Sequence, residues 1–259
     1  MNHSAHFLAR SALLPPHRPT HRRFLRTHLA APLLVWLALT AWATTGGDFW
    51  LADRFYAWQG GRWALQDAYL TEHLIHRFGR DASTAAWFGV LALWIAARLR
   101  PGLSEWRRPL AYLLLSTLSA IALVSALKSL TDMDCPWDLR RYGGANEFFG
   151  ALSQRPPGLA RGRCFPAGHA SAGYAWVALY FFFVLVQPRL RWLGLSLGLA
   201  LGLLFGVSQQ LRGAHFLSHD LWTLGIAWCA ASALYLALAP LKTAAPAGVA
   251  LQAAPGAGR

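Results

Sequence analysis

The chain has 259 residues, of which 55% are hydrophobic and 13 are tryptophan, and its formal net charge is +13. Long uncharged stretches in this composition exclude an ordinary soluble domain and indicate a single integral membrane domain. A strongly basic chain can bind nucleic acid or orient in a membrane beside anionic lipids, and the apolar stretches favour the membrane. Three cysteines are too few for a disulfide scaffold, although one pair can form.

Residues 1–28 are polar and basic, with five arginines and two consecutive prolines. This composition predicts a disordered cytoplasmic tail. The next stretch, Leu29–Thr45, is apolar and is predicted to span the membrane. Because it ends in an Ala-Trp-Ala triplet, a cleaved signal sequence is an alternative interpretation, which leaves the topology of the following chain unchanged.

Residues 46–81 are rich in aromatic side chains with charges between them, which predicts an interfacial loop with an aromatic belt. Within it, residues 71–77 have the pattern of a short amphipathic helix on the membrane surface. His73 and His76 lie on that helix. Without a third ligand, we interpret both as surface residues rather than as a metal site.

Five further apolar stretches complete a set of six predicted transmembrane helices, and the first of the five is only just long enough. They are Ser83–Leu99, Leu110–Leu127, Ala172–Val186, Leu190–Val207 and Leu221–Ala239. Residues 240–259 are rich in Ala, Pro and Gly and are predicted to be a disordered tail. The predicted fold is therefore an all-α integral membrane bundle of six helices over residues 29–239, between two disordered tails.

The fifth predicted helix carries Gly194, Gly198, Gly202 and Gly206, with a glycine at every fourth residue. Small residues at this spacing let neighbouring helices approach closely. We expect this face to pack inside the bundle, and homodimerisation is the alternative.

Arginines gather in the N-terminal tail, in the loop at residues 98–108 and in the short turn at residues 188–191. If six helices alternate, these three segments share one side of the membrane, and the positive-inside rule makes that side cytoplasmic. The aromatic loop, the loop at residues 128–169 and the segment at 208–220 then share the opposite side. In a bacterial inner membrane that side faces the periplasm.

Three stretches on this second side bring ionisable residues to the ends of predicted helices. In chain order the candidates are Lys128, Asp132, Asp134, Asp138, Arg140, Arg141, Arg161, Arg163, His169, Arg212, His215, His219 and Asp220. Lys and Arg neutralise phosphate oxygens, a neutral histidine can attack phosphorus, and a second histidine can protonate the leaving oxygen. The set therefore indicates phosphoryl transfer.

These stretches resemble the three motifs of the type 2 phosphatidic acid phosphatase (PAP2) superfamily of membrane lipid phosphatases. The motifs are Lys-x6-Arg-Pro, Pro-Ser-Gly-His and Ser-Arg-x5-His-x3-Asp. The matching residues are Lys128, Pro136, Pro166, Ala167, Gly168, His169 and His215. The resemblance covers residues from about 29 to 239 and implies a six-helix phosphatase with a periplasm-facing site, a phosphorylated lipid substrate and no metal or other cofactor.

The resemblance also implies roles for individual residues. His215 would be the nucleophile and His169 the general acid, with Asp220 or His219 orienting His215. A register in which His219 is the nucleophile is an alternative.

The chain departs from the family pattern at four positions, which are Cys135 for Arg, Ala167 for Ser, Gln209 for Arg and His219 for Asp. Two family arginines are therefore missing, which leaves a diverged or inactive member as an alternative. The substrate phosphate would be bound by Lys128 with Arg140, Arg141, Arg163 or Arg212, beside the Ala167–Gly168 turn.

Cys135 lies inside the first motif and Cys164 just before the second. In an oxidising periplasm the two can pair, which would hold the first motif against the second. Closing the loop would stabilise the fold by roughly 3–4 kcal/mol in the chain-entropy model. Two free buried thiols are the alternative.

The sequence does not distinguish between the candidate lipid substrates, which are undecaprenyl pyrophosphate, the lipid A phosphates, phosphatidylglycerophosphate and phosphatidic acid. Three other functions also stay open. One is phosphoryl transfer between lipids, and another is a transporter or scaffold without catalysis. The third is a metal-dependent prenyl or glycosyl transferase with magnesium at Asp132, Asp134 and Asp138.

Overall fold

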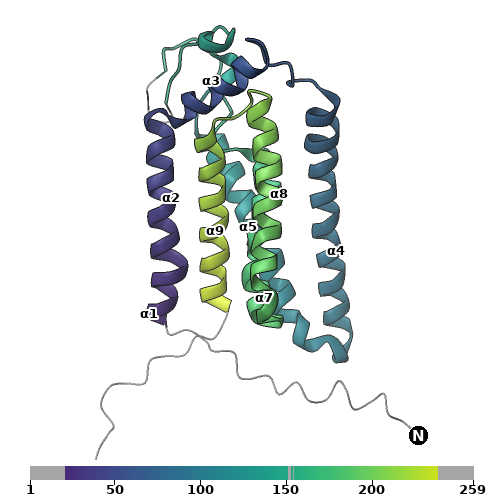
Figure 1. The fold of residues 1–259 in the computed structure, drawn as a ribbon. Coiled ribbons are helices and arrows are strands. Elements are labelled where there is room, and N and C mark those ends of the chain that lie inside the picture. Colours follow the sequence, from purple (N-terminus) through teal and green to yellow (C-terminus); the bar gives the residue numbers. More distant parts are fainter. Residues whose placement is uncertain (1–20, 151–152, 154, 239–259) are drawn as a thin grey trace, which may run out of the picture.

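The computed structural model describes residues 21–150, 153 and 155–238 of the chain. The described residues form helices joined by loops, with no β-strand among them (Figure 1). The α-helices are α1 His21–Phe24, α2 Ala31–Trp42, α3 Asp48–Trp58, α4 Gly79–Leu99, α5 Arg107–Leu130, α6 Gly168–Tyr174, α7 Leu179–Val186, α8 Arg191–Leu211 and α9 Leu217–Leu238. Wider or tighter helical turns cover Leu25–Ala30, Ala43–Gly47, Tyr69–Phe78, Pro101–Trp106, Pro136–Asp138, Arg140–Tyr142, Ala175–Ala178 and Pro188–Leu190.

Within the described residues, six helical segments are long and apolar enough to cross a membrane. They are His21–Trp58, Tyr69–Leu99, Pro101–Leu130, Gly168–Val186, Pro188–Leu211 and Leu217–Leu238. On their outer faces, apolar side chains such as Leu34, Val35 and Phe88 are 67%, 61% and 58% exposed, as lipid-facing residues are. The predicted all-α membrane architecture of six helices is confirmed.

The boundary predicted for the disordered N-terminal tail is wrong, because residues 21–28 are helical. Phe24 is buried and stacks on Tyr235 at 5.3 Å between ring centroids. The Nε2 of His28 lies at hydrogen-bond distance, 3.1 Å, from the hydroxyl of Tyr180. Arginines around Phe24 lower the local hydropathy, so a criterion based on apolar stretches missed this turn. Residues 1–20 and the tail predicted at 240–259 lie outside the described residues.

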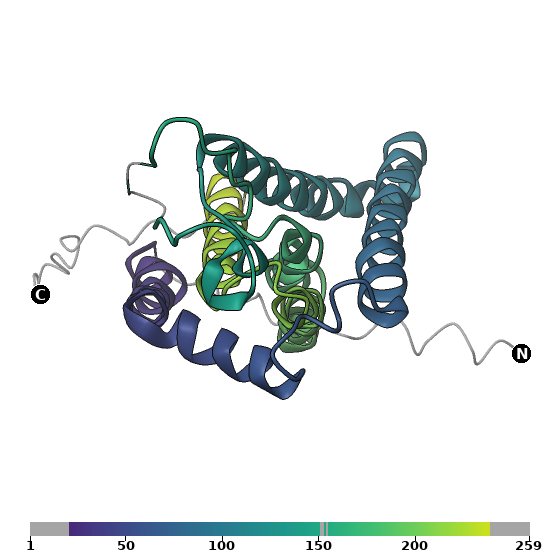
Figure 2. The ribbon, with the colours of Figure 1, turned by 90° about the horizontal axis from the view of Figure 1, so that it is seen from above.

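The loop predicted at residues 46–81 is also wrong, because most of it is helical. After a bend at Gly46, whose φ of 155° favours glycine, α3 runs across one end of the bundle (Figures 1 and 2). The helix expected at residues 71–77 is present within Tyr69–Phe78, but it continues directly into α4. Charged residues between the aromatic side chains lower the mean hydropathy of this stretch, so a search for apolar stretches detects neither helix.

The glycine face of α8 packs inside the bundle, as predicted. A Cβ added to Gly198 would lie 2.4 Å from the backbone nitrogen of Val177, so only glycine allows this approach. The contact sets the fourth span, Gly168–Val186, directly against α8. As a result His169, at the start of that span, meets Phe205 of α8 with ring centroids 4.8 Å apart.

An apolar cap covers the end of the bundle that α3 crosses. It consists of Ala52, Trp63, Met133, Leu139, Tyr142, Phe165 and Phe216, with further aromatic side chains around them. Beside it, the carboxylate of Asp48 accepts the backbone N–H of Ser218 at 2.7 Å and its hydroxyl at 2.6 Å. Asp48 therefore caps α9 from another helix and satisfies an N–H that helix starts leave unpaired.

Candidate active site

His215 and His219 form a buried pair where α8 turns into α9. His215 lies in the turn before α9 and His219 in the first turn of that helix, and their Nδ1 atoms are 3.3 Å from each other. One Nδ1 must carry the hydrogen for this contact. When His215 carries it, the lone pair of its Nε2 is free to attack an electrophile.

Burial lowers the pKa of His215 well below its usual range, and the neighbouring His219 and Lys128 lower it further. The ring is therefore neutral at physiological pH, as a nitrogen nucleophile must be.

Of the two residues expected to orient His215, His219 makes the contact. Asp220 instead accepts a hydrogen bond from the side-chain amide of Gln210 and lies against Gly206 of α8. The position at which the family pattern has Asp thus carries an imidazole that contacts His215.

Lys128 and His169 reach the histidine pair from two other helix ends. Lys128 lies in the last turn of α5, and a Cβ on Gly168 would be 3.3 Å from its Nζ. Both Lys128 and His169 act electrostatically on His215. Among the described residues, no group hydrogen-bonds to the buried Nε2 of His169.

A cavity of about 490 Å³ begins at Lys128 and His169, and neither His215 nor His219 is among the described residues that line it. Lys128, Gly168 and His169 line its polar part. Its remaining walls are largely apolar and come from α4, α5 and the fourth span, including Trp87, Phe88, Ile121 and Trp176. The cavity suits a ligand with an anionic head and an apolar tail.

Three of the expected phosphate-binding arginines lie elsewhere. Arg140 pairs with Glu147 at 2.9 Å, and Arg141 binds Asp53 through two hydrogen bonds of 2.8 and 2.6 Å. Arg163 is exposed. None of the three is among the described residues that line the cavity.

Arg212 is buried and held by four partners. Its guanidinium bonds to the carboxylate of Glu72, to Nδ1 of His76 at 2.7 Å, to the carbonyl of Gln66 at 2.6 Å and to the amide oxygen of Gln209 at 3.2 Å. These contacts use most of its N–H groups, so Arg212 stabilises the wall of the site.

Sequence reasoning missed His76 and Arg80, which both line the cavity. The interpretation of His76 as a surface residue is wrong, since its ring packs edge-on against His169 with centroids 4.4 Å apart. The spacing of Glu72 and His76, one turn apart on a helix that runs into α4, was the available signal. What that helix contacts was not visible in the sequence.

The family comparison agrees with this geometry. The family model described as PAP2 superfamily matches residues 109–242, just over half of the 259-residue chain. The chain belongs to the PAP2 superfamily. Comparison with curated proteins and with solved structures finds no match. Membership supports a phosphatase-type activity, and the matched region contains Lys128, His169, His215 and His219.

In this PAP2 member the turn of the second motif is tied to α9. The N–H of Ala167 donates to the carbonyl of His219 at 3.2 Å, and its own carbonyl accepts the hydroxyl of Thr223 at 3.0 Å. Ala167 is fully buried. Its backbone therefore positions Gly168 and His169, in a place where the family pattern has a serine side chain.

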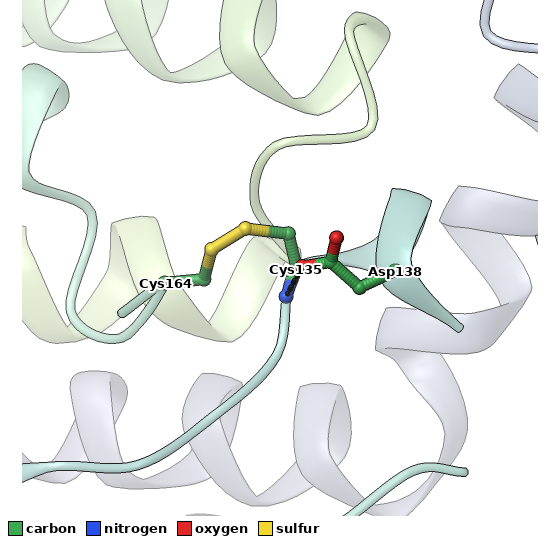
Figure 3. A group of neighbouring side chains, drawn as sticks. All are labelled: Cys135, Asp138 and Cys164. Atoms are coloured by element: carbon green, nitrogen blue, oxygen red, sulfur yellow. Dashed lines mark hydrogen bonds between the residues drawn. A yellow bond between two sulfur atoms is a disulfide. The ribbon is translucent and has the colours of Figure 1, made fainter. Parts of the chain in front are cut away.

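The structure joins Cys135 and Cys164 as a disulfide, with Cα atoms 5.2 Å apart (Figure 3). That spacing lies within the range that disulfides adopt. Asp138 completes a group of three potential metal ligands, but the disulfide uses both thiols and Asp138 accepts the N–H of Cys135 at 3.2 Å. The group therefore acts as a brace between the first and second motifs.

The carboxylates of the magnesium hypothesis do not form a common site. Arg155 binds Asp134 at 2.8 Å and Asp132 at 3.4 Å, and Asp132 also accepts the N–H of Gly162. In the described part of the chain, Asp132, Asp134 and Asp138 do not occur together as a group that could hold one ion. The ion pairs with Arg155 fold the long loop instead.

Replacing Cys135 and Cys164 together by serine is expected to lower the free energy of unfolding by about 3–4 kcal/mol, because the bridge closes a loop across 29 positions. The measurement is the thermal midpoint of the purified protein in detergent. Cys229→Ser, a change in the sixth span, is the matched control and should leave the midpoint unchanged. Identical gel mobility with and without reductant, with two further titratable thiols, would contradict the pairing.

Proposed function

We propose that this PAP2 member is a membrane lipid phosphatase that removes a phosphate or pyrophosphate group from a lipid through a phosphohistidine at His215. One observation carries the proposal. The buried His215–His219 pair lies within electrostatic reach of Lys128 and His169, and these two residues line the polar end of a cavity whose other walls are largely apolar.

In the first step, Nε2 of His215 attacks phosphorus, and the bond between phosphorus and the lipid oxygen breaks. Binding of the anionic phosphate favours the protonated form of His169, which gives its proton to that oxygen, and the ammonium of Lys128 neutralises the phosphate oxygens. In the second step, water attacks the phosphohistidine and His169 takes a proton from it. Inorganic phosphate leaves, and both histidines return to their starting forms.

The substrate class in this proposal is a lipid with an anionic phosphate head, such as undecaprenyl pyrophosphate, a lipid A phosphate, phosphatidylglycerophosphate or phosphatidic acid. The head lies at Lys128 and the tail between α4 and α5. This fits a cavity whose walls away from Lys128 and His169 are Trp87, Phe88 and Ile121.

The proposed location is a bacterial inner membrane, with the site facing the periplasm. Arginines at the site end belong mostly to the long loop or pair with carboxylates. The short segments at the opposite end, away from His169 and His215, support the orientation because arginines gather in them. In the described segments at that end they are Arg22, Arg23, Arg26, Arg98, Arg100, Arg107, Arg108, Arg189 and Arg191, against one acidic residue, Glu105. Such an excess marks the cytoplasmic side.

The test is phosphate release by the detergent-purified protein from these lipids with EDTA present. We expect release to be insensitive to EDTA, because the proposed chemistry needs only histidine, lysine and water. Activity that EDTA removes and magnesium restores would contradict the mechanism. Transfer of labelled phosphate to an added lipid alcohol, without release to water, would identify a lipid-to-lipid phosphotransferase.

A further inference from the structure

We propose that His76 is a phosphate-binding residue of this site, which donates a hydrogen bond from its Nε2 to the substrate and is held in that tautomer by Arg212. This inference rests on the proposed function and extends it. It assigns a binding role to a helix that lies outside the family match at residues 109–242.

The first support is the position of His76. It lies in the helical turn Tyr69–Phe78, directly before α4. Its ring packs against that of His169 at an angle of 65°, with 4.4 Å between centroids. His76, His169 and Lys128 line the same cavity, so a phosphate at Lys128 lies within reach of the helix that carries His76.

The second support is the hydrogen-bond chemistry of its ring. The Nη1 of Arg212 is 2.7 Å from Nδ1 of His76. A guanidinium only donates, so this contact is a hydrogen bond in the tautomer whose Nδ1 carries no hydrogen. In the neutral ring the hydrogen is then on Nε2, which makes that nitrogen a donor.

Glu72 completes the arrangement. Its carboxylate lies 3.1 Å from the same Nδ1, but it also binds Arg212 and, at 3.0 Å, Arg77. Arg77 and Arg212 thus both donate to the carboxylate of Glu72, and Arg212 also donates to the lone pair on Nδ1 of His76. Glu72 also offsets the buried charge of Arg212, which would otherwise be costly.

Arg212 is therefore a positioning residue that acts through His76. The third family motif has an arginine at position 209, where this chain has glutamine. The amide oxygen of Gln209 accepts a hydrogen bond from Arg212, and its buried Nε2 has no hydrogen-bond partner among the described residues. A neutral donor at His76 gives the phosphate a partner on that wall of the site.

The test is the binding of orthovanadate, used as a phosphate-like oxyanion, to the purified full chain and to two variants. His76→Leu removes the donor, whereas His76→Gln places an amide N–H close to the position of Nε2. We expect His76→Leu to weaken binding by about 10- to 100-fold, the range for a hydrogen bond to a charged group. His76→Gln should stay within about threefold of the original chain, as is typical when a donor is retained.

His73→Leu is the matched control, since His73 lies on the same helix and stacks on Tyr69 at 5.3 Å between centroids. It should leave orthovanadate binding unchanged. Equal binding by His76→Leu and the original chain would overturn the inference. So would loss of binding in His76→Gln to the level of His76→Leu, or no orthovanadate binding by the original chain.

Nitrogen NMR of the unmodified chain gives a second readout that needs no stable variant. With labelled histidine, the ring of His76 should show hydrogen on Nε2, and that nitrogen should shift when orthovanadate is added. Hydrogen on Nδ1, or no shift, would overturn the inference. Phosphate release from the lipids separates the two proposals. If the original chain is active and His76→Leu has an unchanged KM, only the role of His76 is refuted. If the original chain is inactive but binds orthovanadate through His76, only the proposed phosphatase reaction is refuted.

Discussion

Replacing His215 by alanine is expected to abolish phosphate release, with a fall in kcat of at least about 10⁴-fold, because the side chain that forms the covalent bond is lost. The reason is specific to this position. His215 is buried, its Nδ1 lies 3.3 Å from that of His219, and burial lowers its pKa so that the ring stays neutral. The measurement is kcat for the best lipid substrate, together with labelling of the acid-quenched protein by radioactive phosphate.

His73→Ala is the matched control for this prediction, since it removes an imidazole outside the cavity, and it should keep full activity. Labelled protein should be absent in His215→Ala. If His215→Ala still accumulates phosphoenzyme while His219→Ala does not, the nucleophile is His219 and the alternative register holds. If neither variant loses activity, the phosphohistidine mechanism is wrong.

Replacing Lys128 by alanine should lower kcat/KM by about 10²- to 10³-fold, the loss typical for removal of one group that stabilises transition-state charge. Lys128 lies with its Nζ against Gly168, and it lines the cavity beside His169. Arg80 lines the same cavity, but its guanidinium is exposed and pairs with Asp81 at 3.0 Å, so we do not expect it to replace Lys128. The measurement is kcat/KM at low substrate, with a thermal midpoint to show that the variant is folded.

Arg141→Ala is the matched control for Lys128. It removes one cation from the same side of the bundle, but this cation is half exposed and bound to Asp53. Its effect on kcat/KM should stay within about threefold, as for exposed ion pairs. A larger loss in Arg141→Ala than in Lys128→Ala would mean that the loop arginines bind the phosphate.

Much of the fold was predictable because a helix that spans a membrane must be long and apolar, and both properties are visible directly in the sequence. Long apolar stretches gave the six spans, and the glycine repeat gave the face of α8 that packs on the fourth span. The helices of residues 46–81 were not predictable in this way. Asp48 and Glu72 look like loop residues in a hydropathy plot, yet each has a buried partner in another helix.

The site was predictable only where a side chain acts from a helix end within a motif. Lys128 and His169 stand at such ends and line one cavity, and both act electrostatically on His215, which lies in the turn just before α9. Asp220 and His219 were equal candidates in the sequence. Neighbouring positions on a helix point in different directions, and the sequence does not show which of the two faces His215. The environment of Arg212 was also not predictable, since its partners Gln66 and His76 lie about 140 positions earlier.

The cap that Asp48 provides for α9 has a consequence for how this protein can be divided. Residues 109–242 match the family, but the helix that carries His219 receives its N-terminal cap from Asp48, and the carbonyl of Leu221 accepts the indole N–H of Trp36 at 2.8 Å. The family-matched region is therefore not a self-sufficient module. A chain cut before residue 109 would leave α9 uncapped and the guanidinium of Arg212 buried without its carboxylate. Recombination between relatives, or transplantation of the motifs, must therefore carry both halves together.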